Sequence, residues 1–304
     1  MMSKTIKPWL QLVRLPNVVT AAADSLAGWL LATGSFGDPG RWLPLAASSI
    51  VLYASGTALN DVFDIEIDRA ERPNRPLPSG QVSRRAAAWL GGLGLVVGPS
   101  LAFMSGTAAS GIVATALALC ILGYDAGVKH TALGPVFMGA CRGLNLLLGM
   151  SYVPGLAGPI GWFAASVYGL YVAGITVVSR SETSGGNRSG LLIGLALQDL
   201  AILGLAGVAL AHRDFPNSGE ERPLIPLEGL LVLALVALAV NSSAARAIQR
   251  PIPELIQKYI KTTLLALIWL HVGVIAGVRG LEPAVLLALL WVPAFILGRW
   301  LYST

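Results

Sequence analysis

Apolar segments long enough to cross a bilayer recur along this 304-residue chain, with only short polar connections between most of them. A membrane-spanning helix needs roughly 20 mainly apolar residues. Charged residues make up 12% of the chain, whereas soluble domains carry about 25%. The sequence therefore predicts an all-α polytopic membrane protein with nine or ten transmembrane helices. The expected spans are residues 17–34, 42–60, 86–104, 107–124, 133–153, 160–178, 189–211, 225–247, 254–278 and 282–300, and the last two are the pair whose separation decides between nine and ten.

The basic residues fall mostly on one side of these spans. With a cytosolic N-terminus, sixteen of the 21 lie on the cytosolic side, and only four lie opposite, namely Arg41, Arg213, Arg222 and Arg279. Cytosolic loops of membrane proteins carry such an excess of Lys and Arg. The net charge of +5 is then a signal of topology. We expect the protein to reside in a lipid bilayer and not to bind nucleic acid, because no basic patch interleaved with aromatic residues is present.

The chain offers neither a disulfide framework nor a zinc site. Cys120 and Cys141 both lie within apolar segments, and the three histidines have no Cys or His at metal-ligand spacing. The basic start of the chain shows no removable signal peptide, so the first span is expected to remain. With no internal repeat and no long linker, residues 1–304 are predicted to form one membrane domain.

A run of carboxylates closes the second expected span. Residues 60–68 read Asn-Asp-Val-Phe-Asp-Ile-Glu-Ile-Asp. At about 100° per residue, one helical face carries an amide and three carboxylates, and Glu66 points away from it. The face consists of Asn60, Asp61, Asp64 and Asp68. Like charges at this spacing destabilise a bare helix, and a cation such as Mg²⁺ would remove that cost. The alternative is a solvated acidic helix end without a ligand.

Arginines follow the carboxylates at three-residue steps. They are Arg69, Arg72 and Arg75, and the segment ends in Pro76-Leu77-Pro78-Ser79-Gly80. Arginine side chains beside metal-bound carboxylates suit a diphosphate, which takes both cations and bidentate donors. The pattern therefore favours a metal-assisted diphosphate site over a solvated helix end.

These motifs resemble those of the UbiA superfamily of intramembrane prenyltransferases. Residues 60–68 fit N-D-x-x-D-x-x-x-D, and residues 74–80 read N-R-P-L-P-S-G. The segment 14–17 looks like that family's first helix, and Tyr124 with Lys129 resembles its tyrosine and lysine after the fourth helix. The resemblance implies a helical bundle around a central cavity and Mg²⁺ bound on two acidic motifs. It also implies transfer of an isoprenyl group from its diphosphate to an aromatic or other small acceptor.

The resemblance and the chemistry together give the expected site. Ionising an allylic C–O bond leaves the charge on diphosphate, where a metal and basic side chains stabilise it. The expected metal ligands are Asn60, Asp61, Asp64 and Asp68, with Glu182 as the candidate for a second metal. The expected catalytic residues are Asp61, Asp64, Asp68 and Lys129. The expected substrate contacts are Asn17, Asp24, Asn60, Arg72, Arg75, Tyr124, Arg142, Asn145, Arg180 and Glu182.

Ionisable residues also occur inside the expected spans. Asp24 lies in the first span, and Arg142 lies in the fifth, close to Asn145. Charged groups at such depth are costly and usually face an interior cavity or one another. We therefore consider two roles for Asp24 and Arg142, contact with the acceptor or the diphosphate and a purely structural pair between helices.

The chain departs from the resembled family at the end of the sixth span. Residues 178–186 read Val-Ser-Arg-Ser-Glu-Thr-Ser-Gly-Gly, so no D-x-x-x-D is present and Glu182 alone supplies a carboxylate. In one account, Arg180 replaces part of the second metal's positive charge and catalysis persists. In the other, the chain belongs to a divergent branch. Residues 124–129 and 138–145 look like the EboC-like branch, which implies association with precursor processing or export in bacteria.

Three functions follow from these observations. The first is a Mg²⁺-dependent prenyltransferase acting on a prenyl diphosphate and a small acceptor. The second is a non-catalytic or transport-associated membrane protein that binds a lipid or metabolite precursor. The third is a prenyl-phosphate sugar transferase, which would require a sugar diphosphate donor. In each case we expect an integral protein of a bacterial inner membrane whose site faces the cytosol.

Overall fold

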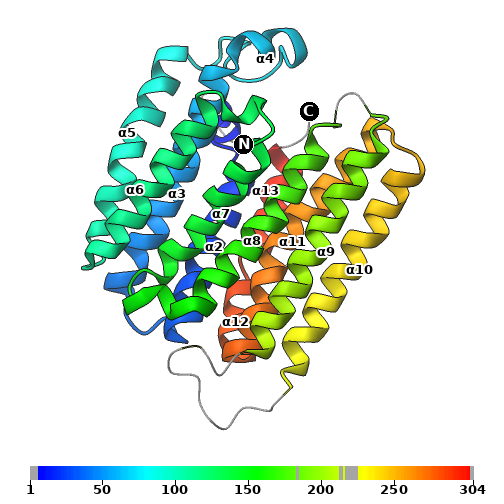
Figure 1. The fold of residues 1–304 in the computed structure, drawn as a ribbon. Helices are drawn as coiled ribbons and strands as arrows, with labels where there is room; N and C mark the ends of the chain where they lie inside the picture. The colour runs from blue at the N-terminus through cyan, green and yellow to red at the C-terminus, as the bar shows by residue number, and fades with distance from the viewer. Residues whose placement is uncertain (1–5, 183–184, 212–214, 216–224, 302–304) are drawn as a thin grey trace.

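The computed structural model describes residues 6–182, 185–211, 215 and 225–301, and all regular elements within this part of the chain are helical (Figure 1). The first half contains α1 (Lys7–Leu12), α2 (Leu15–Thr33), α3 (Pro39–Phe63), α4 (Ile65–Glu71), α5 (Arg84–Phe103), α6 (Ala108–Asp125), η1 (Val128–His130) and α7 (Gly134–Met150). The second half contains η2 (Pro154–Ala157), α8 (Gly158–Ser179), α9 (Arg188–Leu210), α10 (Leu227–Gln249), α11 (Pro253–Arg279), α12 (Leu281–Ala288) and α13 (Trp291–Leu301).

The predicted all-α fold is confirmed. Each of the ten predicted apolar segments coincides with a helix, and the last of them is divided between α12 and α13. Within the described residues, eight helical stretches are long and apolar enough to cross a membrane. They are α3, α5, α6, α8, α9, α10, α11 and the combined stretch Leu281–Leu301. Helices α2 and α7 are not among these eight, and they carry the charged residues Asp24 and Arg142.

Helices α2 and α7 pack backbone to backbone. A side chain at Gly28 would strike the carbonyl oxygen of Leu146, and one at Gly149 would strike the carbonyl oxygen of Ser25. Small residues at helix interfaces allow this close approach in membrane proteins. On the other side of α7, Gly139 makes the same kind of contact with α8 at Gly169. The polar side chains of α2, α7 and α8 are thereby brought together inside the bundle.

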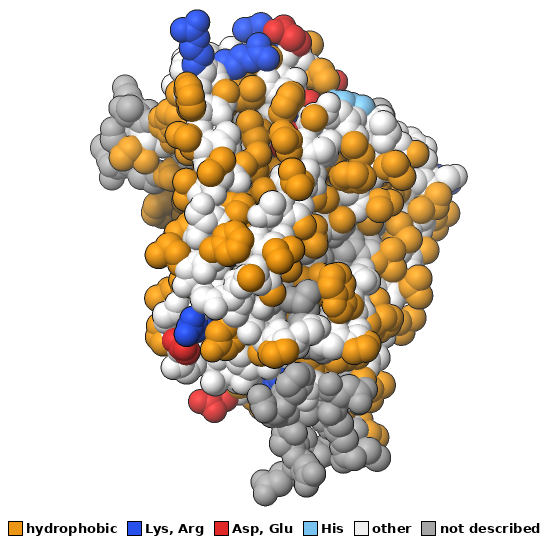
Figure 2. Space-filling view, turned by 60° about the vertical axis from the view of Figure 1, so that its left-hand side comes forward, with side chains coloured by type: hydrophobic (Ala, Val, Ile, Leu, Met, Phe, Trp, Pro, Cys, Tyr) orange, Lys and Arg blue, Asp and Glu red, His pale blue; other side chains and the backbone are white. Residues whose placement is uncertain are grey.

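The flanks of the bundle are covered with exposed apolar side chains. Trp89 and Val96 on α5 are 69% and 67% exposed, and Leu203 on α9 is 70% exposed. Figure 2 shows hydrophobic side chains spread over one flank, with a group of Lys and Arg side chains at one end. A soluble monomer rarely exposes apolar surface of this extent. Together with the spanning helices, this surface identifies an integral membrane protein.

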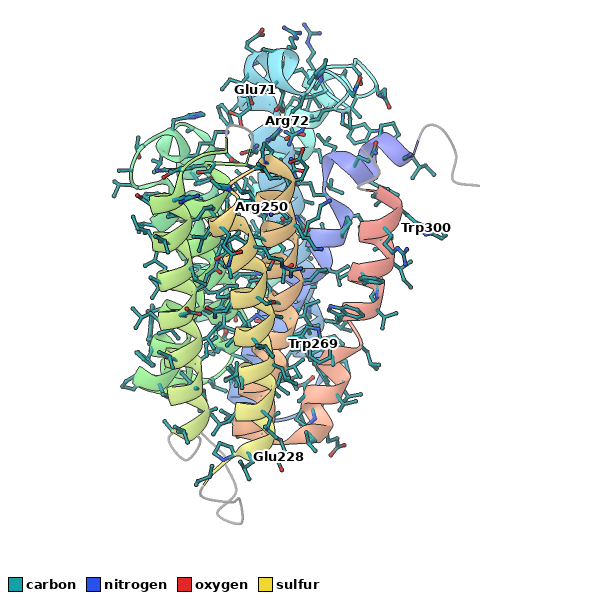
Figure 3. All side chains as sticks on the ribbon, turned by 90° about the vertical axis from the view of Figure 1, so that its right-hand side faces the viewer. Glu71, Arg72, Glu228, Arg250, Trp269 and Trp300 are labelled. Carbon is teal, nitrogen blue, oxygen red and sulfur yellow. The ribbon has the colours of Figure 1, made fainter. Side chains whose placement is uncertain are left out.

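The two ends of the bundle differ in what they carry. Glu71, Arg72 and Arg250 lie at one end, and Glu228 lies at the other (Figure 3). Helix α4 lies across the first end (Figure 1). Lys4, Arg213 and Arg222, which enter the predicted charge distribution, lie outside the described residues. The predicted acidic motif, residues 60–68, lies at the end that carries α4.

Candidate active site at the end of helix α3

The acidic motif occupies the junction between α3 and α4. Asp64 separates the two helices, with φ −90° and ψ 9°. The prediction of one uninterrupted helix over residues 60–68 was therefore wrong, because the backbone at Asp64 leaves the α-helical region. The i to i−4 hydrogen bonds nevertheless continue, from Asp64 N to Asn60 O at 3.0 Å and from Asp68 N to Asp64 O at 2.8 Å. The acidic residues thus remain close together, and Glu66 points away and pairs with Arg69 at 2.8 Å.

Arg75 bridges two carboxylates of the motif. Its Nη1 lies 2.8 Å from Asp68 Oδ2 and 3.0 Å from Asp68 Oδ1. The same nitrogen lies 3.5 Å from Asp61 Oδ1. Asp61 and Asp68 are only 3% and 4% exposed, so these charges are held out of water and require a cation beside them. The arginine that the sequence placed after the acidic motif therefore folds back onto it.

Arg14 supplies a second cation to Asp61. Its Nη2 lies 3.2 Å from Asp61 Oδ1. Arg14 is the one described residue other than glycine with a positive φ, at 51°, and it separates α1 from α2. Left-handed backbone is unfavourable for such a residue, and strain of this kind concentrates at functional sites. Arg14 was not among the predicted site residues, although the segment 14–17 had pointed to this region.

Lys129 holds the remaining carboxylate. Its Nζ lies 2.8 Å from Asp64 Oδ2 and 3.2 Å from Asn60 Oδ1. Asn60 in turn donates its Nδ2 to Asp64 Oδ2 at 3.2 Å. His130 Nε2 lies 3.7 Å from Asp64 Oδ1, a contact that sequence reasoning missed. The turn of η1 therefore brings a lysine and a histidine onto the acidic end of α3.

Two residues predicted for the second metal and the diphosphate lie at the end of α8. Arg180 is exposed and donates its Nη2 to the carbonyl oxygen of Thr131, just after η1. Glu182 is half-buried, and no described residue pairs with its carboxylate. Arg180 thus anchors the turn that carries Lys129. The three remaining predicted contacts, Asn17, Arg72 and Tyr124, are half-buried.

A separate polar cluster surrounds Asp24 in the bundle interior. Arg142 Nη1 donates to Asp24 Oδ2 at 2.7 Å, and Asn145 Nδ2 donates to the same oxygen at 3.2 Å. Tyr168 Oη donates to Asp24 Oδ1, and His271 Nε2 lies 3.0 Å from that oxygen. The structure therefore joins the predicted residues Asp24, Arg142 and Asn145 in one network, as the structural-pair interpretation requires.

Sequence reasoning missed two members of this interior cluster. Tyr168 lies on α8 and His271 on α11, and their ring centroids are 4.3 Å apart. The face of the Tyr53 ring on α3 also lies 5.0 Å from the guanidinium carbon of Arg142. Neither Tyr168 nor His271 lies near Asp24 in the sequence. The signal that could have found them is the rule that a charge at membrane depth requires partners from neighbouring helices.

The donor atoms at the α3 end suit a hard divalent cation. Asn60, Asp61, Asp64 and Asp68 offer only oxygen ligands on this face, the type that Mg²⁺ prefers. As the side chains stand, no three Asp, Glu, His or Cys residues in the described ranges converge as a metal site. Arg75 Nη1 and Lys129 Nζ each lie between oxygens of two different residues of the motif. The acidic motif therefore already binds positive charge at two positions, and a metal would compete with these side chains.

The structure is that of a membrane-embedded helical protein with a cluster of acidic and basic side chains at one end of the bundle. The profile of the UbiA prenyltransferase family matches residues 22–245. The chain belongs to this family, which confirms the resemblance drawn from its motifs.

Relatives and solved structures agree with this assignment. The chain is 28% identical over 242 residues to the digeranylgeranylglyceryl phosphate synthase of Methanoculleus marisnigri, a match that covers 77% of this chain and 85% of that protein. It is 32% identical over 152 residues to the enzyme of the same name from Metallosphaera sedula, covering 49% of this chain and 53% of the relative. The chain thus spans only about half the length of this second relative.

Two solved structures share the fold. One is described as digeranylgeranylglyceryl phosphate synthase in membranes, with a TM-score of 0.65, 21% identity, and coverage of 91% of this chain and 99% of that one. The other is the apo structure of a UbiA homolog from Aeropyrum pernix K1, with a TM-score of 0.64, 19% identity, and coverage of 85% and 97%. At these identities, the likeness concerns the arrangement of the helices.

Proposed function

We propose that the protein is a Mg²⁺-dependent intramembrane prenyltransferase that transfers an isoprenyl group from a prenyl diphosphate to a small acceptor. The observation that carries the proposal is the cluster at the α3 end, in which carboxylates and cations from distant segments interleave. Arg14, Arg75 and Lys129 come from three different parts of the chain and meet the acidic motif there. Membership of the UbiA prenyltransferase family supports the same reaction class.

The chain's own residues would bind and orient the diphosphate. Asp61, Asp64 and Asp68, with Asn60, would hold Mg²⁺, which supplies positive charge to the departing diphosphate. With these carboxylates holding a metal, Arg75 and Lys129, which now pair with Asp68 and Asp64, would be released to donate to diphosphate oxygens. Arg72 and Arg14 add positive charge at the same end. Charge-assisted bonds of this kind strengthen as the C–O bond ionises, because the negative charge on the leaving group grows.

The apolar bundle would hold the prenyl chain and keep water away from the allylic cation. A dry cavity prevents hydrolysis of such a reactive intermediate. The relatives named digeranylgeranylglyceryl phosphate synthase point to geranylgeranyl diphosphate as a donor to test first. We propose two acceptor classes for the first assays, a prenylated glyceryl phosphate and a small aromatic compound.

The end of α8 would complete the site with less acidity than the motif on α3. Glu182 remains our candidate second-metal ligand. Arg180 supports the turn that carries Lys129 through its bond to Thr131, so we propose that it acts on the diphosphate chiefly by positioning Lys129. A non-catalytic, lipid-binding role is the second candidate function. It is favoured by the observation that each carboxylate of the α3 motif is already paired with a protein cation.

We further propose that the α3 end faces the cytosol of a bacterial inner membrane and that residues 1–304 form one domain. The excess of Lys and Arg at this end supports the orientation. His271 on α11 lies beyond the matched stretch and contacts Asp24, which supports a single domain. Reporters after Gly80 and Gly185 are expected to be cytosolic. A reporter at Asn217, which lies outside the described residues, is expected on the opposite side.

The direct test is an assay of purified protein in lipid vesicles. With geranylgeranyl diphosphate, Mg²⁺ and each acceptor class, we expect formation of prenylated acceptor together with release of diphosphate. Binding of the prenyl diphosphate without release would favour the non-catalytic candidate. No binding at saturating Mg²⁺ would exclude both.

A further inference from the structure

Asp125, the last residue of α6, is a buried carboxylate whose bonding is incomplete. It is 3% exposed, and its Oδ2 is buried without any hydrogen-bond partner. Across the described residues, no ion pair to this carboxylate is found either. Burying a carboxylate without a compensating partner is costly, and the C-terminal end of a helix adds further unfavourable negative potential. The charged form of Asp125 is therefore unfavourable at this position unless a cation reaches its unpartnered oxygen.

The surroundings of Asp125 are those of the candidate active site. Asp125 ends α6 four residues before Lys129, whose Nζ lies 2.8 Å from Asp64 Oδ2. In contrast to Asp125, the carboxylates of Asp61, Asp64 and Asp68 each lie within ion-pair distance of a cation. Asp125 therefore lies beside a cluster whose carboxylates are paired, but no cation among the described residues pairs with it. A bound cation would stabilise its charged form.

We propose that Asp125 supplies a carboxylate to the divalent-cation site, in place of the acidic residues missing at the end of α8. The inference rests on the proposed function, because it concerns the same metal. The unpartnered oxygen on α6 has the hard-donor chemistry that Mg²⁺ requires, and it lies at the helix end that leads into the η1 turn, whose Lys129 contacts Asp64. The chain would thus complete its cation site from α6, whereas Glu182 would contribute less.

The test measures binding of Mn²⁺ to the purified full chain in detergent. Binding is detected as loss of the free Mn²⁺ signal in electron paramagnetic resonance. Asp125→Asn keeps the shape of the side chain and removes its charge. We expect it to raise the Kd for Mn²⁺ about tenfold, which corresponds to roughly 1.4 kcal/mol. Asp125→Glu, which retains a carboxylate, should bind within about threefold of the wild type. This second variant keeps the test valid if the amide variant does not fold.

The controls separate this inference from the proposed function. Glu66→Gln removes an exposed carboxylate near the same cluster, and it should leave the Kd unchanged. Asp64→Asn should weaken binding under either account. If Asp64→Asn weakens Mn²⁺ binding and Asp125→Asn binds like the wild type, Asp125 is no part of the site and the proposed function stands. If the wild type binds no Mn²⁺, the metal assigned under the proposed function is overturned together with this inference.

Discussion

Two carboxylate clusters in this protein are built from similar side chains but differ in how completely they are paired. Asp24 in the interior is 0% exposed and receives Arg142, Asn145, Tyr168 and His271 from three other helices. At the α3 end, the side chain of Asp64 is 18% exposed, and its partners are Asn60 on its own helix and two residues of the η1 turn. Both carboxylate oxygens of Asp24 are contacted by two polar side chains each, although Asn145 Oδ1 is buried without a partner. At the α3 end, Asp64 stays partly exposed.

The difference separates a structural role from a binding role. A buried charge whose oxygens are fully occupied has no position left for a ligand, and removing one partner strands the others. An accessible carboxylate paired with a lysine on a short turn can exchange that partner for a metal or release the lysine to a diphosphate. We therefore propose that the interior cluster holds the helices together and that the end cluster binds substrate.

The largest expected effect is on stability, from Asp24→Ala. The substitution leaves Arg142 buried without its counter-charge, and breaking such a pair typically costs about 3–5 kcal/mol. The measurement is the thermal unfolding midpoint of the purified protein in detergent. The double variant Asp24→Asn, Arg142→Met removes both charges and should recover most of the loss. An unchanged midpoint for Asp24→Ala would show that the interior cluster does not hold the helices together.

The next effect is on activity, from Asp64→Asn. It removes a charged metal ligand and the partner of Lys129, and we expect about a hundredfold fall in kcat/KM, within the range for losing one electrostatic contribution to a transition state. The unfolding midpoint should change little, because Asp64 is partly exposed at a helix junction. Activity near that of the wild type would remove Asp64 from the metal site. Asp68→Ala should abolish activity, and it should also lower stability because Asp68 is buried.

The sequence predicted the helices and the family, because both depend on local signals. Apolar length defines a span, and the acidic motif lies within nine consecutive residues. The partners of these residues depended on tertiary structure. His271 reaches Asp24 across 247 positions, and Arg14 reaches Asp61 across 47. No local pattern encodes such contacts.

The role of Arg180 shows the same limit more sharply. Arg180 lies at the end of the sixth span, where the resembled family carries the carboxylates of its second acidic motif. This position predicted that Arg180 replaces part of the second metal's charge and contacts the diphosphate directly. In the structure, its guanidinium bonds to the backbone of Thr131 on the neighbouring turn. A backbone acceptor leaves no trace in the sequence. The assignment to an EboC-like branch also stays a prediction, since it concerns differences within one family.

A smaller effect is expected from Arg180→Ala. If Arg180 acts by positioning the turn with Lys129, its loss should weaken diphosphate binding about threefold to tenfold. Calorimetry with a prenyl diphosphate at saturating Mg²⁺ measures this directly. Loss of a contact made directly to the diphosphate would cost more, roughly ten- to hundredfold in affinity. A hundredfold loss would therefore indicate that Arg180 contacts the diphosphate directly. Arg180→Lys keeps the positive charge but not the guanidinium, and it separates the effect of the charge from that of the bond to Thr131.

The smallest effect is expected from Glu66→Ala. Its side chain is 74% exposed and pairs only with Arg69 on the same short helix. Exposed pairs of this kind contribute little to stability. Steady-state kinetics should show kcat/KM within about twofold of the wild type. A loss comparable with that of Asp64→Asn would mean that negative charge anywhere on α4 supports activity.

The central claim is that the end cluster, and not the interior cluster, carries the reaction. The most direct measurement is Mg²⁺-dependent release of diphosphate from geranylgeranyl diphosphate by protein in lipid vesicles, with acceptor present. The wild type should release diphosphate, Asp64→Asn should lose about a hundredfold of this rate, and the double variant Asp24→Asn, Arg142→Met should retain most of it. Release that survives Asp64→Asn and disappears in the double variant would contradict the account.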